Sequence, residues 1–173
     1  MAIRIFIFVL LIVSILSFVA SFTTNKQKVE DQDRAALTFH DSTIYVLTEN
    51  NVESIVNSKK VMRYKNRDVM YNGELINKVK NSDNIVDSVK SDIILKIDDK
   101  LTFINNVHYQ RGNTIALKTD ELNYDTKTKI ATNKKPFVGT YNSSELKGDS
   151  LYLDLNQSII KAKNSTFKIE LNN

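Results

Sequence analysis

The sequence contains no cysteine, and this absence removes several classes of function at once. Without thiols the chain has no disulfide framework, no thiolate metal site and no cysteine nucleophile. We therefore expect its fold to depend on packing alone.

Glycine and histidine are also scarce, with four and two residues in a chain of 173. No glycine-rich phosphate loop, nucleophile elbow or metal-binding helix motif occurs. His40 and His108 lie far apart with no second ligand at a recognisable spacing, so we predict no metal site. The adjacent acids Asp98-Asp99 and Asp120-Glu121 are typical of strand ends, where alternation would point them to opposite faces. The sequence thus favours a protein that is not an enzyme and binds no cofactor.

Charge is plentiful but unevenly spread over the chain, whose formal net charge is +4. Residues 57–90 contain eight basic and four acidic side chains. Such a segment could hold phosphates or an anionic membrane face, or could be a solvated strand face. The basic residues do not interleave with aromatic ones, so a nucleic-acid partner is not expected.

One long apolar run, Ile5 to Phe22, stands apart from the charged remainder. As a helix it would extend about 27 Å, close to the thickness of a bilayer core, and it exceeds the usual apolar region of a secretory signal. We predict a retained transmembrane anchor at 1–24 and a juxtamembrane linker at 25–36. The alternative is a removed signal, for which Val19-Ala20-Ser21 offers a poor cleavage site. The short basic head favours a cytoplasmic N-terminus, with one domain at 37–173 on the other side.

From Asp92 onward, apolar residues alternate with polar ones in short runs. This period of two predicts strands of about 4 to 7 residues, without helices between them. The sequence therefore predicts an all-β antiparallel domain. The expected breaks between strands are Asp98-Asp99, Asn105-Asn106, Arg111-Gly112-Asn113, Asp125-Thr126-Lys127, Lys135-Pro136 and Asn142-Ser143.

Two further features of the sequence carry weaker signals. "NVESIVN", beginning at Asn51, fits a strand or one helical turn. Residues 119–134 and 148–163 align without gaps at an offset of 29, with five of sixteen positions identical. Either the same hairpin is stacked twice, or the similarity arose by chance in biased sequence.

The order of these segments resembles a known family. A single N-terminal span is followed by "LTFHDSTIYVL", "MRYKNRDVMYN", "LTFINNVHY", "LNYDTKTKIATNKKPF", "LKGDSLYLDL" and "IIKAKNSTFKIEL". This pattern resembles the LptC family of lipopolysaccharide-export proteins. The resemblance implies an OstA/LptA-like twisted β-jelly roll in the periplasm, anchored in the inner membrane by a single pass. It also implies a bridging role, in which lipopolysaccharide is received from the permease subunits of an inner-membrane ABC transporter and passed to a periplasmic jelly-roll protein.

A lipid carrier of this kind needs a shielded path, because each exposed acyl methylene costs about 0.8 kcal/mol in water. Two sheets that splay along one side would provide an apolar groove. The alternation nominates twelve inward residues, which could line the groove or simply fill a core: Leu95, Ile97, Leu101, Phe103, Val107, Tyr109, Ile115, Leu117, Leu122, Tyr124, Leu151 and Leu153. The last strand is expected to offer an edge to a partner strand through Phe167, Lys168, Ile169, Glu170 and Leu171.

Two other functions stay open at this point. One is a membrane-anchored adaptor or assembly protein whose β-sandwich is filled and has no lipid groove. The other is a secreted carbohydrate-active β-domain that works through the Asp and Glu residues named above.

Overall fold

The structure, a computed structural model, describes residues 34–47, 52–79, 85–142 and 144–169. Every regular element in these ranges is a β-strand, and all the pairings are antiparallel. The predicted all-β antiparallel class is therefore confirmed. The apolar run Ile5 to Phe22, the anchor at 1–24 and most of the linker at 25–36 lie outside the described residues. Within those residues, no helix is long and apolar enough to cross a membrane.

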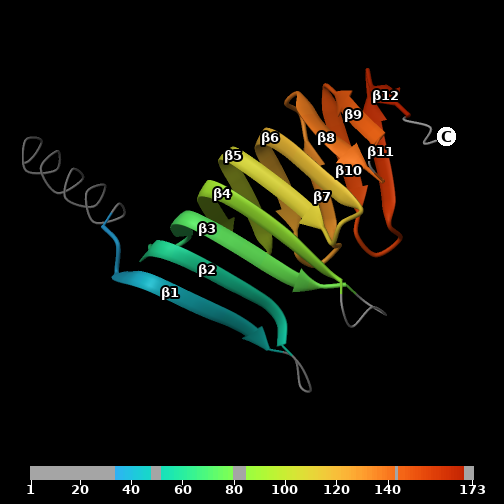
Figure 1. Cartoon of the computed structure of the whole chain (residues 1–173). Coiled ribbons are helices and arrows are strands. Elements are labelled where there is room, and N and C mark those ends of the chain that lie inside the picture. Colours follow the sequence, from blue (N-terminus) through green and yellow to red (C-terminus); the bar gives the residue numbers. More distant parts are fainter. Residues whose placement is uncertain (1–33, 48–51, 80–84, 143, 170–173) are drawn as a thin grey trace, which may run out of the picture.

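Twelve strands form one sheet that divides in two at β6 (Figure 1). Along the main path, β1 to β6 follow one another in chain order, and then β7, β10 and β11 continue from one end of β6. The other end of β6 pairs with β8, which is followed by β9 and β12. The strands are β1 (Leu37–Leu47), β2 (Val52–Arg63), β3 (Asp68–Lys78), β4 (Val86–Ile97), β5 (Lys100–Arg111), β6 (Ile115–Asp125), β7 (Ile130–Asn133), β8 (Phe137–Tyr141), β9 (Ser144–Gly148), β10 (Ser150–Asp154), β11 (Ile159–Lys163) and β12 (Thr166–Lys168).

The first six strands are long because each bends instead of ending. Backbones with positive φ mark the bend at Asp41 in β1, Asn72 in β3 and Asn105-Asn106 in β5. The register shifts at the same level between Lys90 and Ile93 of β4. Asn105-Asn106 is thus a corner inside a twelve-residue strand, and the predicted strand break there is wrong. Asn and Asp tolerate the left-handed conformation, so the local signal is the same for a corner and for a turn.

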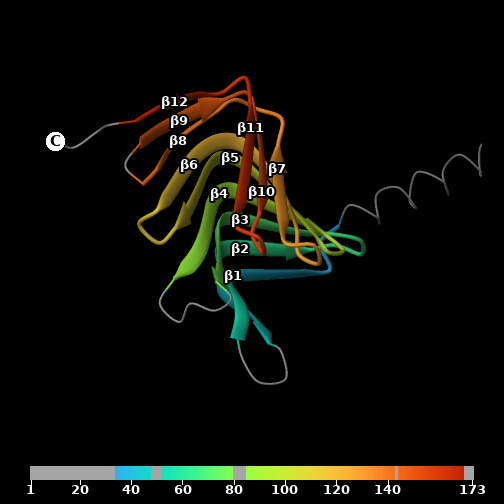
Figure 2. The same ribbon diagram turned by 90° about the vertical axis from the view of Figure 1, so that its right-hand side faces the viewer.

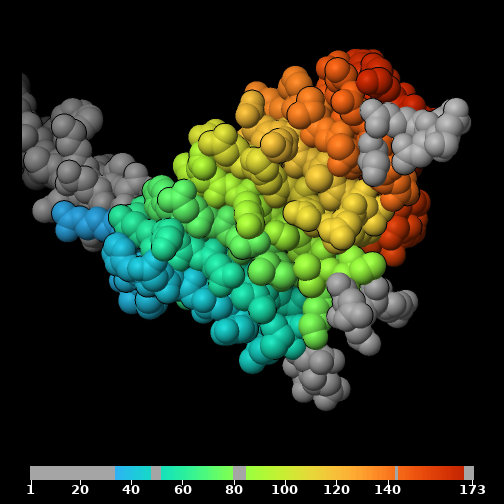
Figure 3. All heavy atoms as spheres, in the orientation of Figure 1, coloured from blue at the N-terminus to red at the C-terminus, as the bar shows by residue number. Residues whose placement is uncertain are grey.

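The corners fold the sheet into two layers that face each other (Figure 2). The first layer contains 37–40, 60–63, 68–71, 93–97, 100–104 and 121–125, together with β7, β10 and β11. The second layer contains 42–47, 52–58, 73–78, 86–91, 107–111 and 115–119, together with β8, β9 and β12. In the space-filling view the colours pass from blue to red across the molecule, so the N-terminal and C-terminal strands lie at opposite ends (Figure 3).

At the corners, small side chains donate hydrogen bonds to backbone carbonyls where the strands bend. Ser58 Oγ lies 3.0 and 2.9 Å from the carbonyl oxygens of Lys60 and Tyr71, and Ser91 Oγ lies 2.9 Å from that of Ile93. Both serines are buried. Since a buried carbonyl without a partner is costly, these hydroxyls stabilise the bend.

The core lies between the layers and consists of inward side chains from β2 to β10. Its largest fully buried members are Phe103, Ile94, Leu122, Leu153, Val61 and Val107. The register explains the cluster, because directly paired residues lie on the same face of a sheet. One row of such partners crosses five strands of the first layer as Val61, Met70, Ile94, Phe103 and Leu122.

The internal sequence repeat corresponds to two equivalent hairpins, β6–β7 and β10–β11. In the first turn, Asp125 Oδ1 accepts hydrogen bonds from the backbone N–H groups of Lys127 and Thr128. In the second, Asp154 Oδ1 accepts them from Asn156 and Gln157. Strands β7 and β10 pair with each other, so the two hairpins are neighbours in the first layer. The stacked-hairpin interpretation is confirmed.

Candidate functional site: a cavity between the layers

A cavity of about 420 Å³ lies between the two layers at the end of the molecule formed by β1 to β3. Its size falls within the range of small-molecule sites, roughly 300 to 1,000 Å³. The apolar lining comes from both layers: Ile44, Val46, Val56 and Leu75 from the second, and Met70, Ile94, Leu101 and Tyr124 from the first.

The cavity has an apolar lining because rows of inward-facing apolar side chains in the two layers lie opposite each other. In the second layer a row of direct partners runs from Ile44 through Val56, Leu75 and Val89 to Tyr109. The row begins in β1, whose one partner among the described strands is β2, and Ile44 there is only partly buried. An apolar surface is therefore present next to the sheet edge without being fully covered.

Charged side chains surround the apolar lining at the free ends of the strands. Three ion pairs hold most of them: Arg63 with Asp68 at 2.8 Å, Lys127 with Asp99 at 2.7 Å, and Lys129 with Glu53 at 2.6 Å. The bidentate contact with Asp68 raises the pKa of Arg63. Lys96 and Asp98 also lie at the rim, and neither forms an ion pair with a described residue. An amphiphile could place an apolar chain inside and an anionic group near Lys96.

Beyond the cavity the interior is filled by side chains. Phe103 is fully buried, and Leu122 and Leu153 are each 2% exposed. A void of about 10 Å³ continues from the cavity, and it shares Leu75, Asn77 and Tyr124 with the cavity lining. That volume holds at most about one water molecule. The space between the layers is thus open at the β1 end and closed further along.

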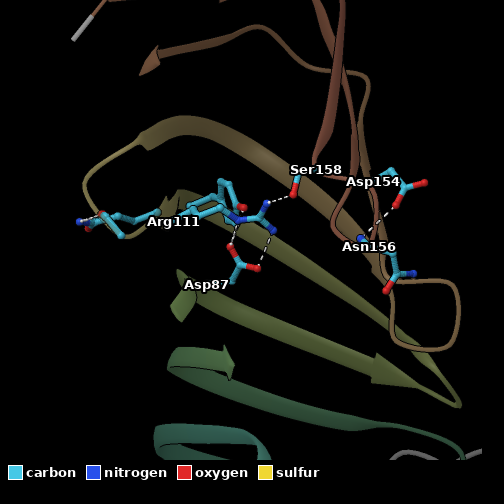
Figure 4. Close-up of polar contacts among 8 residues, drawn as sticks. Asp87, Arg111, Asp154, Asn156 and Ser158 are labelled. Carbon is cyan, nitrogen blue, oxygen red and sulfur yellow. Dashed lines mark hydrogen bonds and ion pairs between the residues drawn. The ribbon is translucent and has the colours of Figure 1, made fainter. Parts of the chain in front are cut away.

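A buried polar cluster stands at the closed end (Figure 4). Arg111 donates from Nε and Nη2 to the two carboxylate oxygens of Asp87, at 2.7 and 2.8 Å, and the Tyr109 hydroxyl donates to Oδ1 at 2.7 Å. The side chains of Arg111 and Asp87 are only 11% and 5% exposed. The hydrogen bond to Asp87 raises the pKa of Arg111, and burial is the main cause of the raised pKa values of Tyr109 and Tyr124. The cluster is therefore a buried ion pair, and no buried side-chain nitrogen or oxygen of the described residues lacks a hydrogen-bond partner.

Two contacts connect the layers across their free ends, one at each of the equivalent turns. Arg111 Nη1 in the second layer donates to Ser158 Oγ in the β10–β11 turn at 3.1 Å. Lys129 in the β6–β7 turn pairs with Glu53 of the second layer. Lys129 and Ser158 occupy the same repeat position, 29 residues apart, and have similar φ values of 57° and 55°. The repeated hairpin thus presents a polar side chain to the opposite layer twice.

Most residues nominated from the alternation are buried between the layers. These are Leu101, Phe103, Val107, Tyr109, Ile115, Leu117, Leu122, Tyr124, Leu151 and Leu153. Of these ten, Leu101 and Tyr124 line the cavity, and the others belong to the filled part. Contact of any of them with lipid stays a prediction.

Leu95 and Ile97 are placed differently from the prediction. Leu95 is half-buried and pairs with Val69 and Thr102, and Ile97 is 45% exposed. The irregularity after Lys90 shifts the alternation of β4 by one residue, so that Ile94 points inward and Leu95 outward. A one-residue slip exchanges the two faces of a strand.

The predicted partner edge is present in part. Phe167 and Lys168 lie in β12, which pairs with β9 alone among the described strands, and Ile169 directly follows it. Phe167 and Ile169 are 48% and 62% exposed. Glu170 and Leu171 lie outside the described residues. The binding of a partner strand at this edge stays a prediction.

The site residues predicted from the sequence did not include those that shape the open end of the cavity, namely Ile44, Val56, Met70 and Leu75. They did not include the Asp87–Arg111 pair either. A signal for this pair was available, because Asp87 and Arg111 are in phase with the apolar residues Val89 and Tyr109. Opposite charges at two inward positions indicate a buried pair.

The described residues include no group of His, Asp and Glu side chains that could hold a metal ion. Three rim carboxylates, those of Asp68, Asp99 and Glu53, each pair with a base, and Asp87 is occupied by Arg111 and Tyr109. The fourth rim carboxylate, Asp98, forms no ion pair with a described residue. The geometry therefore offers a binding cavity.

Comparisons with known proteins give little beyond this geometry. No family model and no curated protein matches the sequence. A crystal structure of LptH, described as the LptA homologous periplasmic component of the conserved lipopolysaccharide transport device from Pseudomonas aeruginosa, matches with a TM-score of 0.40 and 11% identity. The match covers 82% of this chain and 99% of that one. A similarity of this size is too slight to support a conclusion about function.

Proposed function

We propose that this protein is a bridging component of lipopolysaccharide export that holds acyl chains between the two layers of its bent sheet. The observation that carries the proposal is the apolar cavity of about 420 Å³, bounded by both layers and rimmed by charge. The sequence resemblance to the LptC family supplies the lipid class, the inner-membrane location and the ABC-transporter and jelly-roll partners. The bent two-layer sheet agrees with the jelly roll that this resemblance implies.

The cavity suits an amphiphile with an anionic headgroup. At about 30 Å³ for a methylene-sized group, 420 Å³ holds roughly a dozen such groups. Transfer of a chain from water into this space would gain about 0.8 kcal/mol per methylene. Lys96 at the rim supplies a cation without a carboxylate partner among the described residues.

Open sheet edges support a role between two neighbours. Among the described strands, β1 pairs only with β2 at one end, and β11 and β12 each have one partner at the other end. Exposed apolar side chains accompany both ends, including Phe39 and Tyr45 on β1 and Phe167 on β12. Edges of this kind normally need protection, and strand addition from a neighbour would provide it. A neighbour that added a strand at β1 would also extend the inward row that begins at Ile44.

Photo-crosslinking in the native host tests the proposal. A photoreactive residue at Ile44, which lines the cavity, should capture lipopolysaccharide in cells. The matched control is the next residue, Tyr45, which is 59% exposed and lies on the opposite face by alternation. Equal capture at both positions, or none at Ile44, would contradict a lipid site between the layers. Depletion of the protein should also leave newly made lipopolysaccharide at the inner membrane.

A second candidate is an adaptor or assembly protein without a lipid site. It is favoured by the filled interior around Phe103, Leu122 and Leu153. Under this proposal the cavity is only an incompletely packed end of the core. Capture of a protein at β1 or β12, without lipid at Ile44, would support it.

A further inference from the structure

The cavity ends at a defined wall, and this wall lies where the two layers are joined. The small void beyond the cavity is enclosed by Asp87 and Tyr109 of the polar cluster and by Leu155 of the β10–β11 turn. Ser158, three residues after Leu155, accepts the hydrogen bond from Arg111. The wall thus has one part from each layer, and the hydrogen bond from Arg111 to Ser158 joins the two parts.

The turn that carries Leu155 and Ser158 is held in place independently of Arg111. Leu155 N–H donates to the carbonyl of Lys129 at 3.0 Å, and Asn156 Nδ2 donates to the carbonyl of Thr128 at 3.1 Å. Its own Asp154 carboxylate caps two backbone N–H groups (Figure 4). Loss of the Ser158 hydroxyl would therefore free the second layer from the turn while leaving the turn itself folded.

We infer that the contact between Arg111 and Ser158, together with Leu155, sets the length of alkyl chain that the cavity accepts. This inference rests on the proposed lipid-binding function and concerns the same cavity. A chain that enters at the β1 end can extend past Met70 and Leu75 until it meets Leu155 and the Asp87–Arg111 pair. A longer chain would have to displace a buried ion pair or leave its excess methylenes in water. Affinity should therefore rise with chain length, about fourfold per methylene, and then stop rising.

Alkyl phosphates of increasing length, each with a diazirine at the chain end, would test the inference on the full-length protein in neutral detergent. Covalent labelling would be mapped by peptide mass spectrometry, which separates the cavity from the apolar run at Ile5 to Phe22. In the wild type, affinity should rise up to a limiting chain length, beyond which longer chains bind no more tightly. The diazirine at the end of a chain of that length should label Leu75 or Tyr124. Label on Tyr109 or Ala131, which line the void but not the cavity, is not expected.

Two variants should let the cavity accept longer chains, and a third variant should not. Leu155→Ala removes the apolar part of the wall, and Ser158→Gly removes the hydroxyl at a position whose φ of 55° glycine adopts without strain. Both should shift the affinity limit to longer chains and bring label onto Tyr109 or Ala131. The matched control is Leu146→Ala, since Leu146 is also a partly buried residue packed on the core but touches neither the cavity nor the void.

The outcomes separate the two proposals. An unchanged limit in both Leu155→Ala and Ser158→Gly, or an equal shift in Leu146→Ala, would overturn the inference. Wild-type label beyond the wall would also overturn it. If no chain of any length labels the cavity, the lipid-binding function fails, and the inference that rests on it fails too.

Discussion

Lys129 Nζ lies 2.6 Å from Glu53 Oε1, which joins the β6–β7 turn of the first layer to the start of β2 in the second. The two residues are 76 positions apart in sequence, and both lie at the rim of the cavity. With 25% and 40% of their side chains exposed, they form a pair that solvent partly screens.

We predict that this rim pair contributes little stability. A double-mutant cycle with Glu53→Gln and Lys129→Met should give a coupling free energy of about 1 kcal/mol or less, which falls further in high salt. Urea denaturation of the four proteins at two salt concentrations would measure it. A coupling well above this value would show that the pair is desolvated and holds the layers together more strongly than its exposure indicates.

The buried pair should behave in the opposite way. Arg111→Met leaves the Asp87 carboxylate inside the protein with only the Tyr109 hydroxyl as a side-chain donor, and the expected loss is about 3 to 5 kcal/mol. Replacing both partners, as Asp87→Leu with Arg111→Met, removes the uncompensated charge and should recover much of the loss. Chemical denaturation would show this, and a double variant less stable than Arg111→Met would contradict it.

Replacement by alanine should lower the free energy of unfolding by different amounts at Gly139 and Gly73. At Gly139 a Cβ would lie 2.1 Å from the carbonyl oxygen of Ala116, which is backbone of the adjacent strand and cannot move aside. Gly139→Ala should destabilise the protein by about 1 to 3 kcal/mol or more. At Gly73 the nearest atom, at 2.5 Å, is the terminal methyl carbon of Ile94, which can rotate. Thermal unfolding of the two variants should therefore show the smaller loss for Gly73→Ala.

Alkaline pH should weaken the fold through its buried tyrosines. Burial raises the pKa of Tyr109 above its ordinary value, so the folded protein keeps a proton that the unfolded chain releases from about pH 10 upward. The resulting stabilisation is complete below that pH and is lost as the pH rises toward the folded-state pKa. Tyr109→Phe should be less stable at neutral pH, because a hydrogen bond to Asp87 is lost, but its urea midpoint should fall less steeply above about pH 10. Parallel curves for the two proteins would refute the assignment.

Much of the strand pattern could be predicted because it is local. The turn at Asp98-Asp99 follows from the left-handed backbone that Asp98 adopts, and the turn at Asp125-Thr126-Lys127 follows from a carboxylate that bonds its own backbone. The alternation around Leu101 and Phe103 follows from the pleat. The same local rules failed at Asn105-Asn106 and at Leu95, where a corner and a register shift look like ordinary breaks and ordinary alternation.

The sequence by itself determined that this chain forms antiparallel strands with one apolar face, because alternation and turn chemistry act between neighbouring residues. Only the tertiary structure decided that the sheet bends into two layers, that Ile44 and Met70 leave a space between them, and that Asp87 meets Arg111. These features depend on which side chains face each other across strands distant in sequence, and therefore on register and corner position. A shift of one residue in the register of one strand would turn its buried side chains outward and its exposed side chains inward.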